Sequence, residues 1–158
     1  MTRAWISLGS NIEPEENLRH ALRLLAARFG TLVTSPVYRT PAEGFVGDDF
    51  LNMVVGIETE EPPDRVKSAL RAMEHARGRR RGSEKFSSRT LDLDLLTWGD
   101  LVDPDLGLPR EEILHYAFVL GPLADVAADE RHPVVGRTYG ELWRAFTHPP
   151  LERVELAP

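Results

Sequence analysis

The order of its periodic segments constrains the fold of this chain more strongly than any other feature of the sequence. Four stretches rich in β-branched or bulky apolar residues predict strands at 2–8, 31–39, 49–59 and 91–98. Two stretches with apolar residues at helical spacing predict helices, one over 14–29 after an acidic start and one that opens at Pro62–Pro63. The segments therefore follow one another as strand, helix, strand, strand, helix, strand.

This order predicts an α+β fold. It is the order of the ferredoxin-like split βαβ arrangement, an antiparallel sheet with helices packed on one face. Short apolar pieces at 118–126 and 139–146 predict C-terminal additions. Because the 158 residues contain no internal repeat and no long linker, we expect a single domain over 1–158.

Composition excludes several classes of protein. No apolar run approaches the roughly 18 residues of a membrane span, and the first dozen residues lack the apolar core of a signal peptide. The chain has no cysteine, which excludes disulfides, thiolate metal sites and a cysteine nucleophile. The five histidines are scattered, so neither a catalytic triad nor a histidine metal motif can be written. We expect a cytoplasmic protein.

A pair of carboxylates stands out in the last predicted strand. Asp92 and Asp94 are two residues apart, and side chains alternate along a strand, so both carboxylates point to the same side. Neighbouring carboxylates repel each other unless a cation lies between them, and oxygen ligands without cysteine or clustered histidine suit Mg²⁺. An isolated pair of this kind is more often a solvated strand face, but here a basic segment precedes it.

That basic segment runs from Arg77 to Arg89 and contains six basic residues against Glu84 alone, in a chain whose net charge is −6. Acidic and basic groups in succession predict a metal and phosphate site, and no Walker A or Gly-x-Gly-x-x-Gly sequence is present, so arginines and metal would hold any nucleotide. An RNA-binding module is an alternative of another class. The predicted strands lack the paired stacking aromatics of RNA-binding sheets, and the whole chain is acidic, which disfavours it.

Three further positions are candidates for recognition. Glu74 sits near the end of the second helix, where coordination, pairing with the arginines and simple exposure to water all stay open. Asn52 lies in an apolar strand, where a buried amide needs partners and suits recognition of a polar ring. Thr40–Pro41 begins a loop whose backbone groups can meet a ligand or simply form a turn.

Five short motifs occur in order along the chain: Leu8-Gly-Ser-Asn11, Tyr38-Arg-Thr-Pro41, Phe50-Leu-Asn52, Glu74-x-x-x-Gly-Arg79 and Arg89-Thr-Leu-Asp-Leu-Asp94. Taken together, they resemble those of the 6-hydroxymethyl-7,8-dihydropterin pyrophosphokinase family of folate biosynthesis. The resemblance runs in order from about Trp5 to Val126. It implies a ferredoxin-like enzyme that moves the β,γ-diphosphate of its co-substrate ATP onto the pterin hydroxymethyl oxygen, releases AMP and uses two Mg²⁺ ions.

The resemblance also implies roles for individual residues. Asp92 and Asp94 would bind both metals, and Arg79 and Arg89 would join them in catalysis by contacting the nucleotide phosphates. The remaining residues implied near ATP are Arg71, Glu74 and Arg81. The residues implied around the pterin are Thr40, Pro41, Phe50, Asn52, Phe86 and Phe118. We expect a monomer that acts on small molecules and binds neither nucleic acid nor membranes.

The chain departs from the family pattern at a few of these positions. Arg110 stands where a histidine that helps bind ATP is usual, and Tyr116 stands where an arginine is usual. Glu43 replaces a typically apolar residue of the pterin loop. We hypothesise that Arg110 takes over phosphate contacts of the missing arginine. The same departures leave a divergent paralogue as an alternative, one that transfers diphosphate to a modified pterin or another small alcohol.

Overall fold

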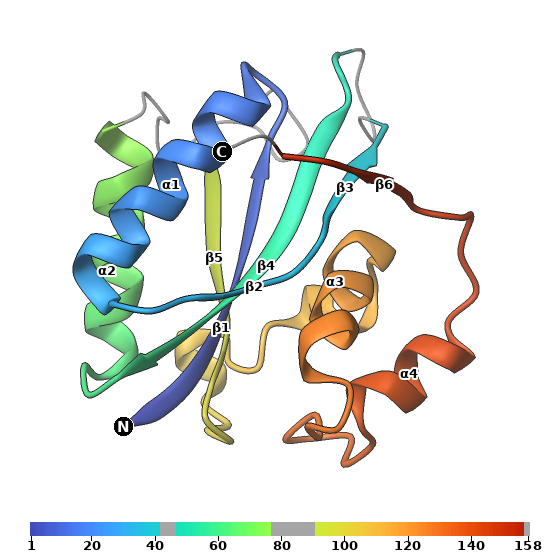
Figure 1. Ribbon diagram of the computed structural model, residues 1–158. Helices are drawn as coiled ribbons and strands as arrows, with labels where there is room; N and C mark the ends of the chain where they lie inside the picture. Colours follow the sequence, from blue (N-terminus) through green and yellow to red (C-terminus); the bar gives the residue numbers. More distant parts are fainter. Residues whose placement is uncertain (42–46, 77–90, 157–158) are drawn as a thin grey trace.

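The computed structural model describes residues 1–41, 47–76 and 91–156, and within them one antiparallel sheet runs through the centre of the molecule (Figure 1). The strands follow the order β5-β1-β4-β3-β6, and β2 also pairs with β4. Their bounds are β1 Thr2–Ser10, β2 Val33–Thr34, β3 Val37–Thr40, β4 Phe50–Thr59, β5 Asp92–Trp98 and β6 Glu152–Val154. β5 is thus an edge strand beside β1.

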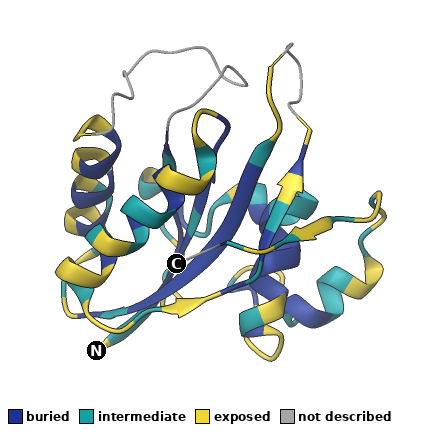
Figure 2. Cartoon of the chain, turned by 45° about the horizontal axis from the view of Figure 1, so that its top comes forward, coloured by how far each residue is buried: buried dark blue, intermediate teal, exposed yellow. Residues whose placement is uncertain are grey.

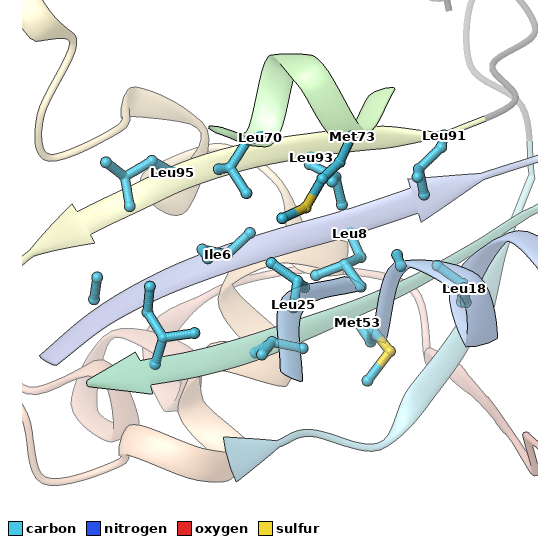
Figure 3. Close-up of a cluster of buried hydrophobic side chains, with 14 of the residues drawn as sticks. Ile6, Leu8, Leu18, Leu25, Met53, Leu70, Met73, Leu91, Leu93 and Leu95 are labelled. Atoms are coloured by element: carbon cyan, nitrogen blue, oxygen red, sulfur yellow. The ribbon is translucent and has the colours of Figure 1, made fainter. Parts of the chain in front are cut away.

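Two helices cover one face of the sheet. α1 Pro14–Phe29 and α2 Pro63–Ala76 both have proline in the first turn, where its missing N–H costs nothing, and each buries an apolar stripe. Figure 3 shows Leu91, which precedes β5, and Leu93 and Leu95 of β5 lying on the same side of the sheet as side chains of α2. This layer confirms the predicted ferredoxin-like arrangement.

The C-terminal additions cover the other face of the sheet. They are two short 3₁₀ helices, η1 Pro104–Leu106 and η2 Glu111–Leu114, followed by α3 Ala117–Ala127 and α4 Tyr139–Ala145. Trp5, Val54 and Leu96 from the strands form a second core cluster with Ile113 and apolar residues of α3. In Figure 2 the central strands are accordingly dark blue along much of their length. The sequence predicted the additions but not that they would close this second face.

The strand predicted at 31–39 is interrupted. Pro36 has no N–H to donate to a ladder, and the chain divides here into β2 and β3. Ser35 bridges the break, because its N–H donates to the Val54 carbonyl at 2.9 Å and its hydroxyl accepts from the Val54 N–H at 2.8 Å. β1 also continues through Gly9 and Ser10, two residues beyond the predicted strand 2–8.

No helix in the described part of the chain is long and apolar enough to cross a membrane.

Candidate functional site

The predicted site residues of the sheet lie on one face. Strand pairing sets Asp92 opposite Gly9, Gly9 opposite Asn52, and Asn52 opposite Tyr38, so these four residues form a row across β5, β1, β4 and β3. Directly paired residues of neighbouring strands point to the same side of a sheet. Adjacent strands are 4.7–4.9 Å apart, so about 10 Å separates the backbones that hold Asp92 and Asn52.

Asp92 and Asp94 share this face, as the sequence predicted. Leu91, Leu93 and Leu95 belong to the core beneath α1 and α2, and alternation therefore directs the two aspartates to the opposite side. Both aspartates are partly exposed. Their carboxylates thus lie side by side at an accessible position on a rigid strand.

Glu74 of α2 binds the outer edge of β5. Its side chain is 5% exposed, and its Oε2 atom accepts a hydrogen bond from the Leu93 backbone N–H at 2.8 Å. Exposure to water, one of the three alternatives for this residue, is therefore wrong. The contact fixes the backbone of β5 between the two aspartates.

A pocket opens along the same edge, between α2 and the segment that follows β5. Asp94 and Glu74 contribute acidic groups to it, and Lys67, Arg71 and Arg110 contribute basic ones. Leu70, Leu93 and Leu95 complete its lining. The predicted nucleotide residues Arg71, Glu74 and Arg110 are therefore brought together with one of the predicted metal ligands.

Arg110 is fixed at this pocket by its backbone and its side chain. Its N–H donates to the Leu96 carbonyl at 2.8 Å, which attaches the residue to the edge of β5. Its Nη2 atom lies 3.6 Å from Oδ1 of Asp94 and 2.6 Å from Oε2 of Glu112. The guanidinium thus lies between two carboxylates.

A second group of predicted residues lies across the row from the aspartates. Asn52 is 7% exposed, and its Nδ2 atom donates to the hydroxyl of Thr40 at 2.7 Å. A Cβ atom on Gly9 would approach Oδ1 of Asn52 to 3.0 Å, so the absence of a side chain at Gly9 leaves room beside this amide. Phe50 pairs with Thr40, and Pro41 follows at the exposed end of β3.

Phe118 and Tyr116 lie at the start of α3. Their rings stack with centroids 5.0 Å apart and an angle of 26° between the planes. Both rings pack against the second core cluster. Tyr116, the residue that departs from the family pattern, is therefore a neighbour of the aromatic residue predicted to stack on the pterin.

Five predicted site residues lie outside the described residues: Glu43, Arg79, Arg81, Phe86 and Arg89. Within the described part of the chain, no group of three or more acidic or histidine side chains is arranged to hold a metal ion. Two carboxylates on one strand nevertheless fit Mg²⁺, which usually takes one or two protein carboxylates and completes its octahedron with water and substrate phosphates.

Two features of the site were missed by sequence reasoning. Gly9 lies just beyond the predicted strand 2–8 and was given no role of its own, although a glycine inside a strand often marks a close approach. Glu112 has no motif around it, and its contact with Arg110 becomes visible only once η2 is folded.

Comparisons with known proteins identify the family of the chain. The family described as 7,8-dihydro-6-hydroxymethylpterin-pyrophosphokinase (HPPK) matches residues 5–128. A Pseudomonas aeruginosa protein described as 2-amino-4-hydroxy-6-hydroxymethyldihydropteridine pyrophosphokinase is 38% identical over 167 residues, covering 99% of this chain and 97% of its own. A Methylorubrum extorquens protein of the same description is 37% identical over 161 residues, covering 98% of this chain and 100% of its own.

Solved structures agree in fold. Plasmodium falciparum HPPK-DHPS in complex with SDX-DHP superimposes with a TM-score of 0.71 at 15% identity. The match covers 92% of this chain and 43% of that longer chain. At this level of identity the likeness supports the fold alone.

The family match and the relatives define the class of protein, a transferase that moves a pyrophosphate group. The chain belongs to the 7,8-dihydro-6-hydroxymethylpterin-pyrophosphokinase family. It is therefore a pyrophosphokinase of folate biosynthesis, a transferase with ATP as co-substrate, as the sequence predicted.

Proposed function

We propose that the chain transfers the β,γ-diphosphate of ATP to the hydroxymethyl group of 6-hydroxymethyl-7,8-dihydropterin. The hydroxymethyl oxygen attacks the β-phosphorus, and the bond from that phosphorus to the oxygen bridging it to the α-phosphorus breaks. AMP leaves with that oxygen, the diphosphate stays on the pterin, and the hydroxyl proton is released to solvent. This proposal rests on family membership and on the arrangement of the site.

The observation that carries it is the position of the aspartates between two different recognition areas. Asp94 lines the pocket at the outer edge of β5. Asp92 is the first residue of the row that runs through Gly9 to Asn52. A polyphosphate in the pocket and a ring against Asn52 would meet at the aspartates. Such an arrangement holds the two reactants in line, which is how enzymes of phosphoryl transfer gain most of their rate.

The pocket is the proposed ATP site. Arg71 and Arg110 supply guanidinium groups that match phosphate oxygens, and Lys67 adds a third cation. Glu74 lines the same pocket but already accepts the Leu93 N–H, so we assign it to holding β5 next to ATP rather than to the phosphates. We assign further phosphate contacts to Arg79, Arg81 and Arg89 from the resemblance.

The Asn52 side of the row is the proposed pterin site. A pterin ring presents amide-like donors and acceptors along its edge, and a buried amide positioned by Thr40 is suited to bind them. The missing side chain of Gly9 leaves space for the ring edge. Pro41 and Phe50 would border the ring and Phe118 would stack on it, and we assign Glu43 and Phe86 to the same site from the resemblance.

We propose that Asp92 and Asp94 hold two Mg²⁺ ions. When bound, the ions would neutralise charge on the transferring diphosphate and orient it. The protein's own contribution is the rigid strand, which keeps both carboxylates on one face, with the Arg110 guanidinium 3.6 Å from Asp94. With arginines around the phosphates, positioning and electrostatics account for the reaction without a side-chain base.

The experiment that tests the proposal measures AMP release from ATP and Mg²⁺, with and without 6-hydroxymethyl-7,8-dihydropterin, and identifies the pterin product by mass. We expect AMP that depends on the pterin and a product heavier by one diphosphate. AMP release that does not depend on the pterin would contradict the proposal.

A divergent paralogue is the second candidate, favoured by Arg110 and Tyr116 at the proposed site. It predicts magnesium-dependent ATP binding without turnover of the standard pterin. Calorimetry with ATP and Mg²⁺ distinguishes this outcome from a complete loss of the phosphate site.

We also propose that the enzyme is a cytoplasmic monomer acting on small molecules alone. The absence of cysteine fits a reducing compartment. Light scattering after size exclusion tests the monomer, since a mass of twice 17.8 kDa would contradict it.

A further inference from the structure

Arg110 is held by a carboxylate that no sequence motif marks. Oε2 of Glu112 lies 2.6 Å from Nη2 of Arg110, whereas Oδ1 of Asp94 lies 3.6 Å from the same atom. The shorter contact is the one to Glu112. All three side chains are about one-third exposed, so neither contact is a deeply buried ion pair.

Glu112 is itself well anchored. It belongs to η2, in which Ile113 is completely buried in the second core cluster. The carbonyl of Glu112 accepts the N–H of His115 at 3.2 Å and that of Tyr116 at 3.1 Å. A side chain on such a fixed backbone loses less conformational entropy when it restrains a neighbour than one on a loop would lose.

We propose that Glu112 is a positioning residue for ATP binding, which keeps the Arg110 guanidinium beside Asp94 where the ATP phosphates would bind. This inference rests on the proposed function and assigns a role to a residue outside the predicted site. An unrestrained arginine samples many rotamers and forfeits side-chain entropy when it binds a phosphate. Because Glu112 already restrains the Arg110 side chain, less side-chain entropy is lost when ATP binds.

The geometry leaves Arg110 able to serve a third anion. Both carboxylate contacts use Nη2, and a guanidinium has five N–H donors distributed over three nitrogens. Nε and Nη1 make no ion pair within the described residues, so they retain donors for phosphate oxygens. The two contacts at Nη2 thus orient the guanidinium and leave its other N–H donors for phosphate oxygens.

Electrostatics alone predicts the opposite effect of Glu112 on ATP. A carboxylate near a polyphosphate repels it, so removing the charge should strengthen binding if Glu112 did nothing else. A positioning role predicts weaker binding instead. The sign of the change therefore separates the two explanations.

The test measures the dissociation constant of ATP with Mg²⁺ by calorimetry, in the absence of pterin, for Glu112→Gln and for Glu111→Gln. Glu111 is the matched control, because it is the adjacent glutamate of η2 and pairs only loosely with His115 at 3.8 Å. We expect Glu112→Gln to raise the dissociation constant about three- to tenfold and Glu111→Gln to leave it unchanged or lower it slightly. Unchanged or tighter binding by Glu112→Gln would overturn the proposal.

A double-mutant cycle shows whether Glu112 acts through Arg110. In the Arg110→Ala background, Glu112→Gln should have no further effect on ATP binding. An equal effect in both backgrounds would overturn the positioning role and leave a purely structural one. Melting temperatures of all variants check that each is folded.

Failure of this inference is distinguishable from failure of the proposed function. If the unaltered protein releases AMP in the presence of pterin while Glu112→Gln behaves like Glu111→Gln, the function stands and only the positioning role is wrong. If the unaltered protein binds no ATP, both are wrong.

Discussion

The carboxylate of Glu74 accepts a hydrogen bond from the backbone N–H of Leu93, with 2.8 Å between Oε2 and N. Leu93 lies between Asp92 and Asp94 on β5, and in the part of the chain that the structure describes no strand pairs with the outer edge of β5. Here a helix side chain accepts the N–H that a further strand would bind, and it does so between the two predicted metal ligands.

Replacing Glu74 by alanine should destabilise the protein by about 1–3 kcal/mol, because it leaves a buried N–H without its acceptor. Glu74→Gln keeps an acceptor oxygen and should cost less. Urea unfolding measures both changes. Glu16→Ala, an exposed glutamate of α1, is the control and should stay within about 0.5 kcal/mol. If Glu74→Ala resembled the control, the hydrogen bond would contribute little to folding.

The contrast between Glu74 and Asp92 shows what the sequence can and cannot reveal about this site. Alternation along a strand needs only local information, so the shared face of Asp92 and Asp94 was predictable. The position of Glu74 depends on how α2 packs against β5. The sequence around one helix residue does not contain this information, so coordination, pairing with the arginines and exposure to water all stayed open. The same holds for Glu112, whose partner Arg110 is near in sequence but whose helix η2 was not predicted.

The fold likewise has parts that local sequence patterns predicted and parts that depend on tertiary contacts. Strong periodicity predicted α1 at its observed bounds, and the order of segments predicted the sheet. The short strand β6 and the covering of the second face by α3 were not predicted, because they depend on tertiary contacts such as those of Trp5 and Leu96. A residue such as Trp5 looks the same in sequence whichever layer it packs against.

Asp92→Asn and Asp94→Asn should each reduce turnover about 100-fold or more, because a proposed metal ligand is lost and each tenfold corresponds to about 1.4 kcal/mol of barrier. Stability should change little, since both side chains are partly exposed. Steady-state kinetics at saturating ATP and pterin measure the loss. Asp100→Asn, in the exposed turn after β5, should keep full activity. Full activity of either site variant would refute the metal assignment.

Gly9→Ala should weaken pterin binding selectively. The new Cβ would lie 3.0 Å from Oδ1 of Asn52, and Asn52 is restrained by its 2.7 Å bond to Thr40, so the methyl group must occupy space proposed for the ring. We expect the KM for pterin to rise about tenfold, the equivalent of ~1.4 kcal/mol, while the KM for ATP stays constant. The KM for ATP is the internal control. A parallel rise in both constants would instead indicate a general distortion of the sheet.

His132 should make stability depend on pH. Its side chain is 3% exposed, and its Nδ1 atom accepts the N–H groups of Val134 and Val135 at 3.2 and 3.1 Å, so the ring is neutral in the folded protein. Burial lowers its pKa below the usual 6.5. Well above pH 6.5 both states are neutral and the residue contributes no slope. As the pH falls through 6.5 the unfolded state takes up the proton first, so the free energy of unfolding falls.

His132→Asn keeps an acceptor without titrating, and its unfolding free energy should fall less between pH 7 and 5 in urea titrations than that of the unaltered protein. His115→Asn, at an exposed position, should keep the full slope. Equal slopes for His132→Asn and the unaltered protein would show that His132 does not control this pH dependence.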